Sequence, residues 1–513
     1  MFLLLSSSEG VSNAASEPGK LGTLPKLVLA ILILLVALDR LATTTADPDL
    51  WGYLSFGHLF WTSGHFPYHD IFSFLPTLPQ WVYHEWLTGV LFYPIYQAFG
   101  FTGLQILKFV LALVTLGIVY LTARRLKASF FGAMVGLFII QGFLTIGYSP
   151  VRAQVFTYAF YSITLYVLET ARQAGRWRFL LVLVPLQIFW CNVHGGFLAG
   201  LGLVGLYALG EALSRRPFWP YVGILLFAGV STLINPYGLE YWQYLIKAII
   251  MPRPEITEWA SMIRAYQAGN DHGGLIYISS IVLIFGLLAW RVRWRDLTAI
   301  LVLCVSLYLG MKHTRHLVFF LLLTGAYFPV ILTIYFEKIS LEPKLVSVGK
   351  RLGWKVPFIA GLILIISYGA KIISHNPLSL VPPPLPGQTI KSGIYYPVGA
   401  VEYIKSHHLA GNLVTEFDWG EYLIWNLFPQ CKVALDGRYE TVYSNEIANQ
   451  YFNFIYGHKN WGQFLEKYPV KMVLIKRRRK LYSLIKAEHQ WLQVYRDQGC
   501  VLFIKQNIQK QIP

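Results

Sequence analysis

The sequence predicts a polytopic α-helical membrane protein of about eleven spans, with an α/β domain at its C-terminal end. Three observations predict this fold class. Of the 513 residues, 55% are hydrophobic and only 13% are charged, whereas about 25% of the residues in an ordinary soluble domain are charged. Apolar runs that approach the roughly 20 residues needed for a membrane span alternate with short clusters of Lys and Arg. After residue 373, a Pro-rich stretch leads into short strand-like and helix-like runs.

The first 23 residues are expected to form a cytoplasmic tail. They begin with a short apolar run and continue with Ser, Gly and Ala, so they lack the basic and then apolar order of a cleaved signal peptide. The transmembrane domain is predicted to cover residues 24–373.

The basic clusters predict the orientation of the spans, because cytoplasmic loops carry an excess of Lys and Arg. With the N-terminus inside, every dense basic cluster except the one at 312–315 falls on the cytoplasmic side. The C-terminal domain is then extracytoplasmic. The predicted spans are 24–42, 105–123, 130–146, 153–168, 179–190, 197–213, 220–233, 275–290, 297–310, 317–335 and 356–368.

Residues 86–99 are apolar and aromatic but short for a crossing, and the run is interrupted by Pro94 and Gly100. We expect a helix that lies against the membrane face or re-enters it, because a full crossing would invert most of the basic loops. Residues 235–274 are expected to form a long outer segment, and 337–355 a basic cytoplasmic loop.

The first outer loop, residues 43–105, is expected to hold the active site. No Lys or Arg occurs between Leu41 and Leu107, although the whole chain has a formal net charge of +17. The loop is instead rich in acidic, histidine and aromatic residues. Ionisable groups close to membrane depth are costly, and they are by default candidates for a functional site.

The C-terminal part is predicted to be a Pro-rich linker, 374–396, and a soluble α/β domain, 397–513. The stretch from Val381 to Pro386 favours a stiff polyproline conformation. Cys431 and Cys500 are able to pair in an oxidising compartment or to stay as thiols. The expected strands are 412–415, 432–435, 471–475 and 501–504, and the expected helices are 398–406, 422–426, 461–467 and 481–487.

Asp47 and Asp49 stand two residues apart, on either side of a proline, at the end of the first span. A carboxylate here can act as a general base on an acceptor hydroxyl, and the pair can bind a divalent cation. Asp47 is also a good N-cap for a helix that begins at Pro48. Capping and catalysis are compatible.

Cationic and histidine residues complete the candidate site. Arg152, Lys312 and Arg315 suit a lipid phosphate, since Arg offers a planar fork of donors and Lys a point charge; the alternative is contact with lipid headgroups. His194 and His316 are further candidates for substrate or phosphate contact, although His194 is equally explained as a histidine satisfied by a neighbouring helix. Glu85 is either a second acid or a residue of the membrane interface.

Other classes of partner are disfavoured. The basic residues lie between apolar runs rather than on one face, which argues against nucleic acid. The histidines of the first loop do not have a zinc-ligand spacing. No cofactor is expected beyond a possible divalent cation at Asp47 and Asp49.

A span, an outer loop opening with the pair Asp47 and Asp49, aromatic juxtamembrane helices, many further spans and an exported C-terminal domain resemble the GT-C superfamily of membrane glycosyltransferases. The similarity is to the bacterial relatives of protein O-mannosyltransferases and to the aminoarabinose transferases. It implies a GT-C-like fold and a donor sugar on a polyprenyl phosphate, used without a nucleotide. It also implies that Asp47 or Asp49 is the base and that Arg152 with Lys312 or Arg315 holds the phosphate.

The sequence also departs from these relatives. It lacks the Asp-Glu pair of the mannosyltransferases and the Lys-Pro-Pro segment of the aminoarabinose enzymes, and has His84-Glu85-Trp86 in that neighbourhood. The sugar and the acceptor are therefore not carried over. Residues 419–425 and 435–438 resemble a segment of uncharacterised bacterial membrane proteins of this class. This resemblance implies that the chain belongs to the class, but it implies no chemical role for these residues.

We therefore expect a multi-pass protein of the bacterial inner membrane that moves a sugar from a polyprenyl-phosphate donor to a lipid, glycan or protein acceptor outside. A transporter or flippase of lipid-linked saccharides is the main alternative. No inverted repeat is visible, and the polar residues gather on one face rather than at the midplane. A non-catalytic protein of envelope assembly is the third possibility.

Overall fold

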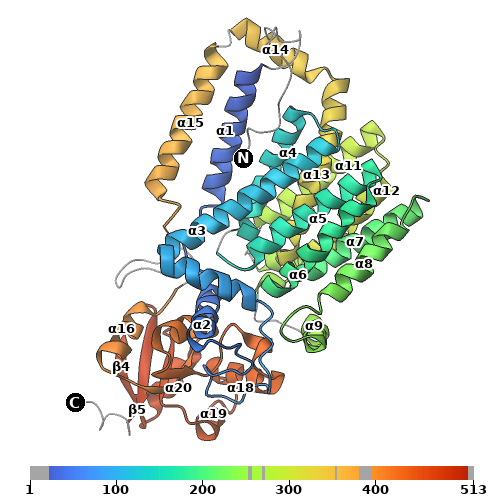
Figure 1. Cartoon of the computed structure of the whole chain (residues 1–513). Coiled ribbons are helices and arrows are strands. Elements are labelled where there is room, and N and C mark those ends of the chain that lie inside the picture. Colours follow the sequence, from blue (N-terminus) through green and yellow to red (C-terminus); the bar gives the residue numbers. More distant parts are fainter. Residues whose placement is uncertain are drawn as a thin grey trace.

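The structure is a computed structural model that describes residues 22–148, 151–251, 257–268, 272–352, 355–379 and 395–506. A bundle of helices occupies one end of the molecule and a sheet domain the other, with a short helix, α2, between them (Figure 1). The tail at 1–21 and most of the predicted linker, 380–394, lie outside the described residues.

The N-terminal part is helical throughout. A helix lies at each of the eleven predicted span positions. Its helices are α1 (Thr23–Arg40), α2 (Pro48–Ser63), α3 (Trp86–Arg125), α4 (Phe130–Tyr148), α5 (Gln154–Ala174), η1 (Trp177–Val182), α6 (Leu183–Val193), α7 (Phe197–Leu213), α8 (Trp219–Ser231), α9 (Leu239–Ile250), η2 (Thr257–Trp259), α10 (Met262–Gln267), α11 (His272–Val292), α12 (Leu297–Lys312), η3 (Thr314–His316), α13 (Leu317–Lys338), α14 (Leu341–Leu352) and α15 (Lys355–His375).

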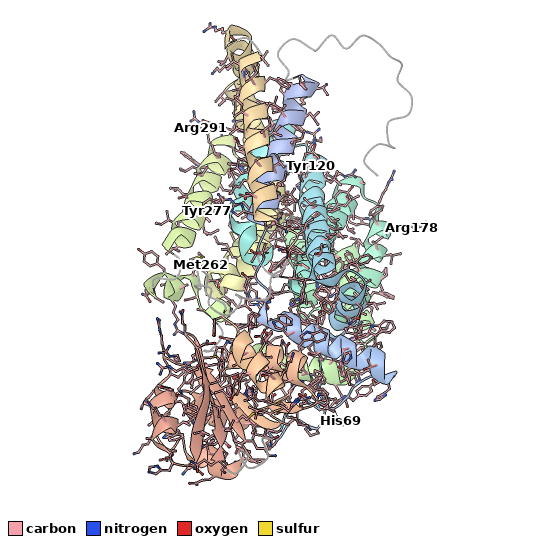
Figure 2. The ribbon with its side chains drawn as sticks, turned by 90° about the vertical axis from the view of Figure 1, so that its left-hand side faces the viewer. His69, Tyr120, Arg178, Met262, Tyr277 and Arg291 are labelled. Atoms are coloured by element: carbon pink, nitrogen blue, oxygen red, sulfur yellow. The ribbon has the colours of Figure 1, made fainter. Side chains whose placement is uncertain are left out.

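Within the described ranges, four helices are long and apolar enough to cross a membrane, and they belong to α3, α11, α13 and α15. Five shorter apolar helices accompany them, in α4, η1 with α6, α7, α8 and α12. These helices support a multi-pass membrane protein, while the number of eleven spans and their orientation stay predictions. Arg178 and Arg291, both predicted to be cytoplasmic, lie in the half of the bundle away from the sheet domain, and His69 lies next to that domain (Figure 2).

The helix α3 is divided at Gly100, whose φ of 60° and ψ of −157° are not helical. Glycine tolerates this backbone conformation because it has no Cβ. The part before Gly100 packs against α2, and the indole Nε1 of Trp61 donates to the carbonyl oxygen of Val90 at 3.0 Å. The sequence expectation of a separate helix at 86–99 thus agrees with the break at Gly100.

Two segments that were expected as loops contain helices. The predicted basic loop 337–355 contains α14, and the outer segment 235–274 contains α9 and α10. In α14, Leu341, Leu345 and Leu352 recur at helical spacing, and the basic residues between them obscured this pattern.

The C-terminal domain is a five-stranded sheet with helices, which agrees with the α/β prediction. The strand order is β2-β1-β3-β5-β4; β1 runs parallel to β2 and β3, whereas β5 runs antiparallel to β3 and β4. The sequence did not predict β4 and α18. The elements are α16 (Val398–Ser406), β1 (Gly411–Thr415), η4 (Phe417–Trp419), α17 (Gly420–Leu427), β2 (Cys431–Val433), η5 (Tyr439–Thr441), α18 (Asn445–Ile455), α19 (Gln463–Lys467), β3 (Met472–Lys476), α20 (Lys480–Ala487), β4 (Trp491–Arg496) and β5 (Cys500–Lys505).

Cys431 and Cys500 are buried free thiols. They lie on β2 and β5, which are separated in the sheet by β1 and β3. Since neighbouring strands are about 4.8 Å apart, this separation is too large for a disulfide.

The first outer loop packs directly on the C-terminal domain. Residues 72–74 run alongside β2, where the N–H of Phe74 donates to the carbonyl of Val433 at 3.1 Å and the N–H of Val433 donates to the carbonyl of Phe72 at 3.0 Å. The loop thereby extends the edge of the sheet. A buried ion pair between Asp70 and Arg438 lies beside this edge, with side chains 1% and 2% exposed.

Candidate active site

A cavity of about 1180 Å³ lies where the helical bundle, the first outer loop and the C-terminal domain meet. Its walls come from α2, residues 83–85 just before α3, α5, the turn between α6 and α7, α7, α9, η2, α12, η3 and residues 417–441. All eight residues that the sequence predicted for the site line this cavity, namely Asp47, Asp49, Glu85, Arg152, His194, Lys312, Arg315 and His316. Their individual roles stay predictions.

Asp47 is the N-cap of α2, as the sequence predicted. Its Oδ1 accepts a hydrogen bond from the N–H of Asp49 at 3.1 Å, and Pro48 occupies the first helical position. Gly64, with a φ of 70°, ends the helix. The cap fixes where α2 begins, and so it fixes how Asp49 projects in the first turn.

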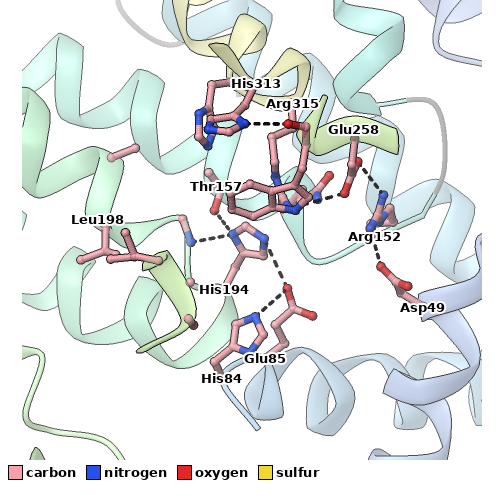
Figure 3. Close-up of a pocket in the computed structure, with 18 of the residues that line it drawn as sticks. Asp49, His84, Glu85, Arg152, Thr157, His194, Leu198, Glu258, His313 and Arg315 are labelled. Atoms are coloured by element: carbon pink, nitrogen blue, oxygen red, sulfur yellow. Dashed lines mark hydrogen bonds and ion pairs between the residues drawn. The ribbon is translucent and has the colours of Figure 1, made fainter. Parts of the chain in front are cut away.

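Arg152 connects the carboxylates of this region. Its Nη2 forms an ion pair with Asp49, its Nε lies 3.3 Å from Asp47 Oδ1, and its Nη1 lies 3.3 Å from Glu258 Oε2. Figure 3 shows Arg152 between Asp49 and Glu258. Burial raises the pKa of Asp47 to about 7, and the charge of Arg152 opposes that rise. The side chain of Asp49 is 32% exposed, which makes it the more accessible acid of the pair.

Glu85 and His194 form the second polar group of the cavity. His194 Nδ1 accepts from the N–H of Gly196 at 2.8 Å, so the ring proton of the neutral histidine is on Nε2. This Nε2 lies 3.3 Å from Glu85 Oε1 (Figure 3). Thr157 Oγ1 lies 2.8 Å from the same Nδ1, and the hydroxyl of Tyr53 donates to Glu85 Oε2 at 2.8 Å. These contacts fix the tautomer of His194 and the orientation of Glu85.

Burial raises the pKa of Glu85 to about 7, with the charge of Asp49 as the next cause. The same burial, together with the charge of Arg315, lowers the pKa of His194. Both groups are therefore driven towards their neutral forms.

Replacing Glu85 by glutamine is expected to change how stability depends on pH. A carboxyl group whose pKa is raised from 4.5 to about 7 stabilises the fold fully below pH 4.5 and loses that contribution as the pH rises to 7. The lost contribution is at most about 3 kcal/mol. We therefore measure the melting temperatures of the wild type and of E85Q in nanodiscs and subtract the second from the first. This difference should decrease between pH 4.5 and pH 7. The exposed Glu446→Gln should show a constant difference, and a constant difference for E85Q would contradict the prediction.

Lys312, Arg315 and His316 gather at the junction of α12 and η3. Arg315 Nη1 lies 3.5 Å from Glu258 Oε1, and its guanidinium lies 4.8 Å from the ring centroid of Trp259. Lys312 is exposed and has no ion-pair partner among the described residues. His316 Nδ1 is buried without a hydrogen-bond partner in the same described set. Lys312 therefore offers unused donors to a ligand, and Lys312 and Arg315 both offer positive charge.

Beyond this polar end, the cavity is apolar. Its apolar lining comes from α7, α9 and α12, and comprises Leu198, Ala199, Leu203, Leu206, Leu245, Ala248, Ile249, Val302, Val305 and Leu309. A ligand with a charged head and a hydrocarbon chain fits both ends.

The sequence analysis did not assign Tyr53, Thr157 or Glu421 to the site, and it gave no role to Glu258 on the predicted outer face. Tyr53 and Thr157 carry no local signal, because their partners lie 32 and 37 residues away. Glu421 lies in the 419–425 segment that the sequence singled out without a chemical role. No group of three or more His, Cys, Asp or Glu side chains in the described ranges is arranged to hold a metal ion. In the structure, Asp47 and Asp49 both contact Arg152. The divalent cation that the sequence analysis considered at this pair stays a prediction.

Comparison with known proteins defines the fold. No protein-family model matches the sequence, and no curated protein matches it. The crystal structure of ArnT from Cupriavidus metallidurans bound to undecaprenyl phosphate aligns with a TM-score of 0.53 and 12% identity, over 94% of this chain and 97% of that chain. Its apo structure aligns with a TM-score of 0.48 and 12% identity, over 93% and 97%. The first of these alignments shows that this chain has the fold of ArnT.

Proposed function

We propose that this protein is a membrane glycosyltransferase that moves a sugar from a polyprenyl-phosphate donor to an acceptor on the extracytoplasmic face of the bacterial inner membrane. One observation carries the proposal. A single cavity joins an apolar end to a polar end that holds both the cations Lys312 and Arg315 and the acid Asp49. The ArnT structure with the same fold binds undecaprenyl phosphate, a lipid of this chemical kind.

In the proposed reaction, the polyprenyl chain occupies the apolar end and the phosphate lies at the junction of α12 and η3. Lys312 and Arg315 neutralise the charge that develops on the phosphate as the bond between C1 of the sugar and the phosphate oxygen breaks. The leaving group is the polyprenyl phosphate. Arg315 is oriented for this by its contacts with Glu258 and Trp259.

Asp49 is the base in this proposal. One oxygen, Oδ2, is held by Arg152, which leaves Oδ1 without a hydrogen-bond partner within the described structure. The acceptor hydroxyl attacks C1 of the sugar with inversion, and its proton passes to Asp49. Arg152 thus orients the base, which differs from the phosphate-binding role that the sequence predicted for it.

Removing the two cations tests the donor site. We expect Lys312→Ala and Arg315→Ala each to weaken the binding of undecaprenyl phosphate about tenfold or more, because a hydrogen bond to a charged group contributes about 1.5–3 kcal/mol. Native mass spectrometry or a titration in nanodiscs measures this affinity. Arg291→Ala, an exposed substitution in the distant half of the bundle, is the control. Equal affinity for undecaprenol and undecaprenyl phosphate in the wild type would contradict the donor site.

A further inference from the structure

One wall of the cavity belongs to the C-terminal domain. Residues 417–441 supply Phe417, Asp418, Glu421, Gly437, Arg438, Glu440 and Thr441 to its lining. This stretch includes both segments, 419–425 and 435–438, to which the sequence gave no chemistry. The wall faces α2, and α17 packs directly against that helix.

Glu421 projects from α17 towards Asp49. It is 5% exposed, and its Oε2 accepts a hydrogen bond from the N–H of Gly52 at 3.0 Å. Glu421 lines the cavity, and its Oε1 has no hydrogen-bond partner among the residues that the structure describes. This oxygen is therefore available to a hydrogen-bond donor of a ligand.

The backbone of Gly437 passes close to the carboxylates of both Glu421 and Asp49. A Cβ atom at Gly437 would lie 3.0 Å from Glu421 Oε1 and 3.5 Å from Asp49 Oδ1. The φ of Gly437 is not positive, so the backbone itself does not demand glycine. Glycine instead lets the chain pass beside two carboxylate oxygens without a Cβ that would crowd them.

The neighbouring residues hold this part of the wall in place. Arg438 follows Gly437 and is buried, with its Nε and Nη2 each 2.7 Å from an oxygen of Asp436 and its Nη1 paired with Asp70. The charge of Arg438 is thus already neutralised by two carboxylates. Arg438 is therefore not available to attract an anionic ligand.

The remaining charge at this wall is negative, because Arg438 is shared by the two carboxylates of Asp70 and Asp436. Burial, followed by the charges of Asp49 and Asp436, raises the pKa of Glu421 and drives it towards its neutral form, in which it can both donate and accept a hydrogen bond. Asp418 pairs with Lys476 at 3.2 Å, so that cation is also engaged. A phosphate or carboxylate on the ligand would be repelled here, whereas a group with several donor hydrogens would be attracted.

We propose that Glu421 and Asp49 together bind neighbouring hydroxyl groups of the acceptor, and that the acceptor head is therefore a neutral sugar or polyol and not a phosphorylated one. This inference rests on the proposed function, because it places the acceptor hydroxyl next to the proposed base. Glu421 selects the acceptor, and the C-terminal domain contributes directly to the substrate site.

Binding of two matched probes tests the inference without any donor. Methyl glucoside carries neutral neighbouring hydroxyls, and glucose 6-phosphate carries the same ring with a dianion. Saturation-transfer NMR on the full-length protein in nanodiscs should show that methyl glucoside binds more tightly. Glu421→Gln, which still accepts from Gly52, and Gly437→Ala, whose Cβ would crowd the oxygens of Glu421 and Asp49, should each weaken that binding about tenfold.

The controls separate this inference from the proposed donor site. Both variants should bind undecaprenyl phosphate as the wild type does, and Glu446→Gln, an exposed substitution in α18, should leave sugar binding unchanged. Preference for glucose 6-phosphate, absence of binding by either probe, or unchanged binding in both variants would overturn the inference. Loss of undecaprenyl phosphate binding in the wild type, with sugar binding retained, would instead overturn the donor site alone.

Discussion

Replacing Asp49 by asparagine is expected to lower sugar transfer about a thousandfold while leaving donor binding intact. General-base catalysis typically contributes 10²- to 10⁴-fold to a rate, and Asn has almost the same shape without a basic oxygen. The substitution also removes one ion pair of Arg152. That guanidinium keeps Asp47 and Glu258 as partners, so the fold should survive. Transfer of labelled sugar from a panel of polyprenyl-phosphate sugars to an envelope extract, by protein purified into nanodiscs, measures the effect.

Asp47→Asn is the matched comparison. Asn caps a helix about as well as Asp, so the hydrogen bond to the N–H of Asp49 is kept and we expect a loss of no more than about tenfold. Glu446→Gln should leave transfer unchanged. A large loss in D47N with an active D49N would make Asp47 the base. Full transfer in both variants would contradict base catalysis by this acid pair.

The sequence located much of this site because its signals were local or were tied to topology. The acid pair, the N-cap at Asp47 and the break at Gly100 are readable within a few residues, and the structure shows the cap and the break. The positive-inside rule left Arg152, Lys312 and Arg315 on one predicted face, and in the structure they line one cavity. Topology therefore grouped residues that lie far apart in the chain.

What the sequence missed depends on contacts across the fold. Glu421 lies 369 residues from its partner Gly52, and no periodicity links them. Glu258, in the predicted outer segment 235–274, bridges Arg152 and Arg315, and its contact with Arg152 spans 106 residues of sequence. The tautomer of His194 depends on the backbone N–H of Gly196, which composition does not reveal.

The role of Arg438 is a similar case, and its replacement by alanine should have the second large effect. The side chain is 2% exposed, pairs with Asp70 and Asp436, and lies 5.0 Å and 4.8 Å from the ring centroids of Phe72 and Trp81. Removing one partner of a buried ion pair costs about 3–5 kcal/mol, because the remaining charges are left uncompensated. Melting temperature should fall sharply in R438A, whereas the exposed Arg478→Ala should leave it unchanged.

Proteolysis reports on the docking of the first loop specifically. The loop contains no Lys or Arg, so trypsin has no site there, but its many aromatic residues are sites for chymotrypsin. The packing of residues 72–74 along β2 should protect it in the wild type, and R438A should expose it. Protection that persists in R438A would show that the backbone pairing alone holds the loop.

The sign of the stability change caused by a second substitution, Asp70→Asn, distinguishes a charge effect of Arg438 from a packing effect. In the wild type, Asp70→Asn should destabilise the protein, because it removes an ion pair with Arg438. In the R438A background, the same substitution should stabilise it, because it removes a buried charge that has lost its partner. If Asp70→Asn destabilises both backgrounds equally, Arg438 acts mainly through its packing between Phe72 and Trp81. A reversal of sign would show that the charge itself joins the first loop to the domain that carries Glu421.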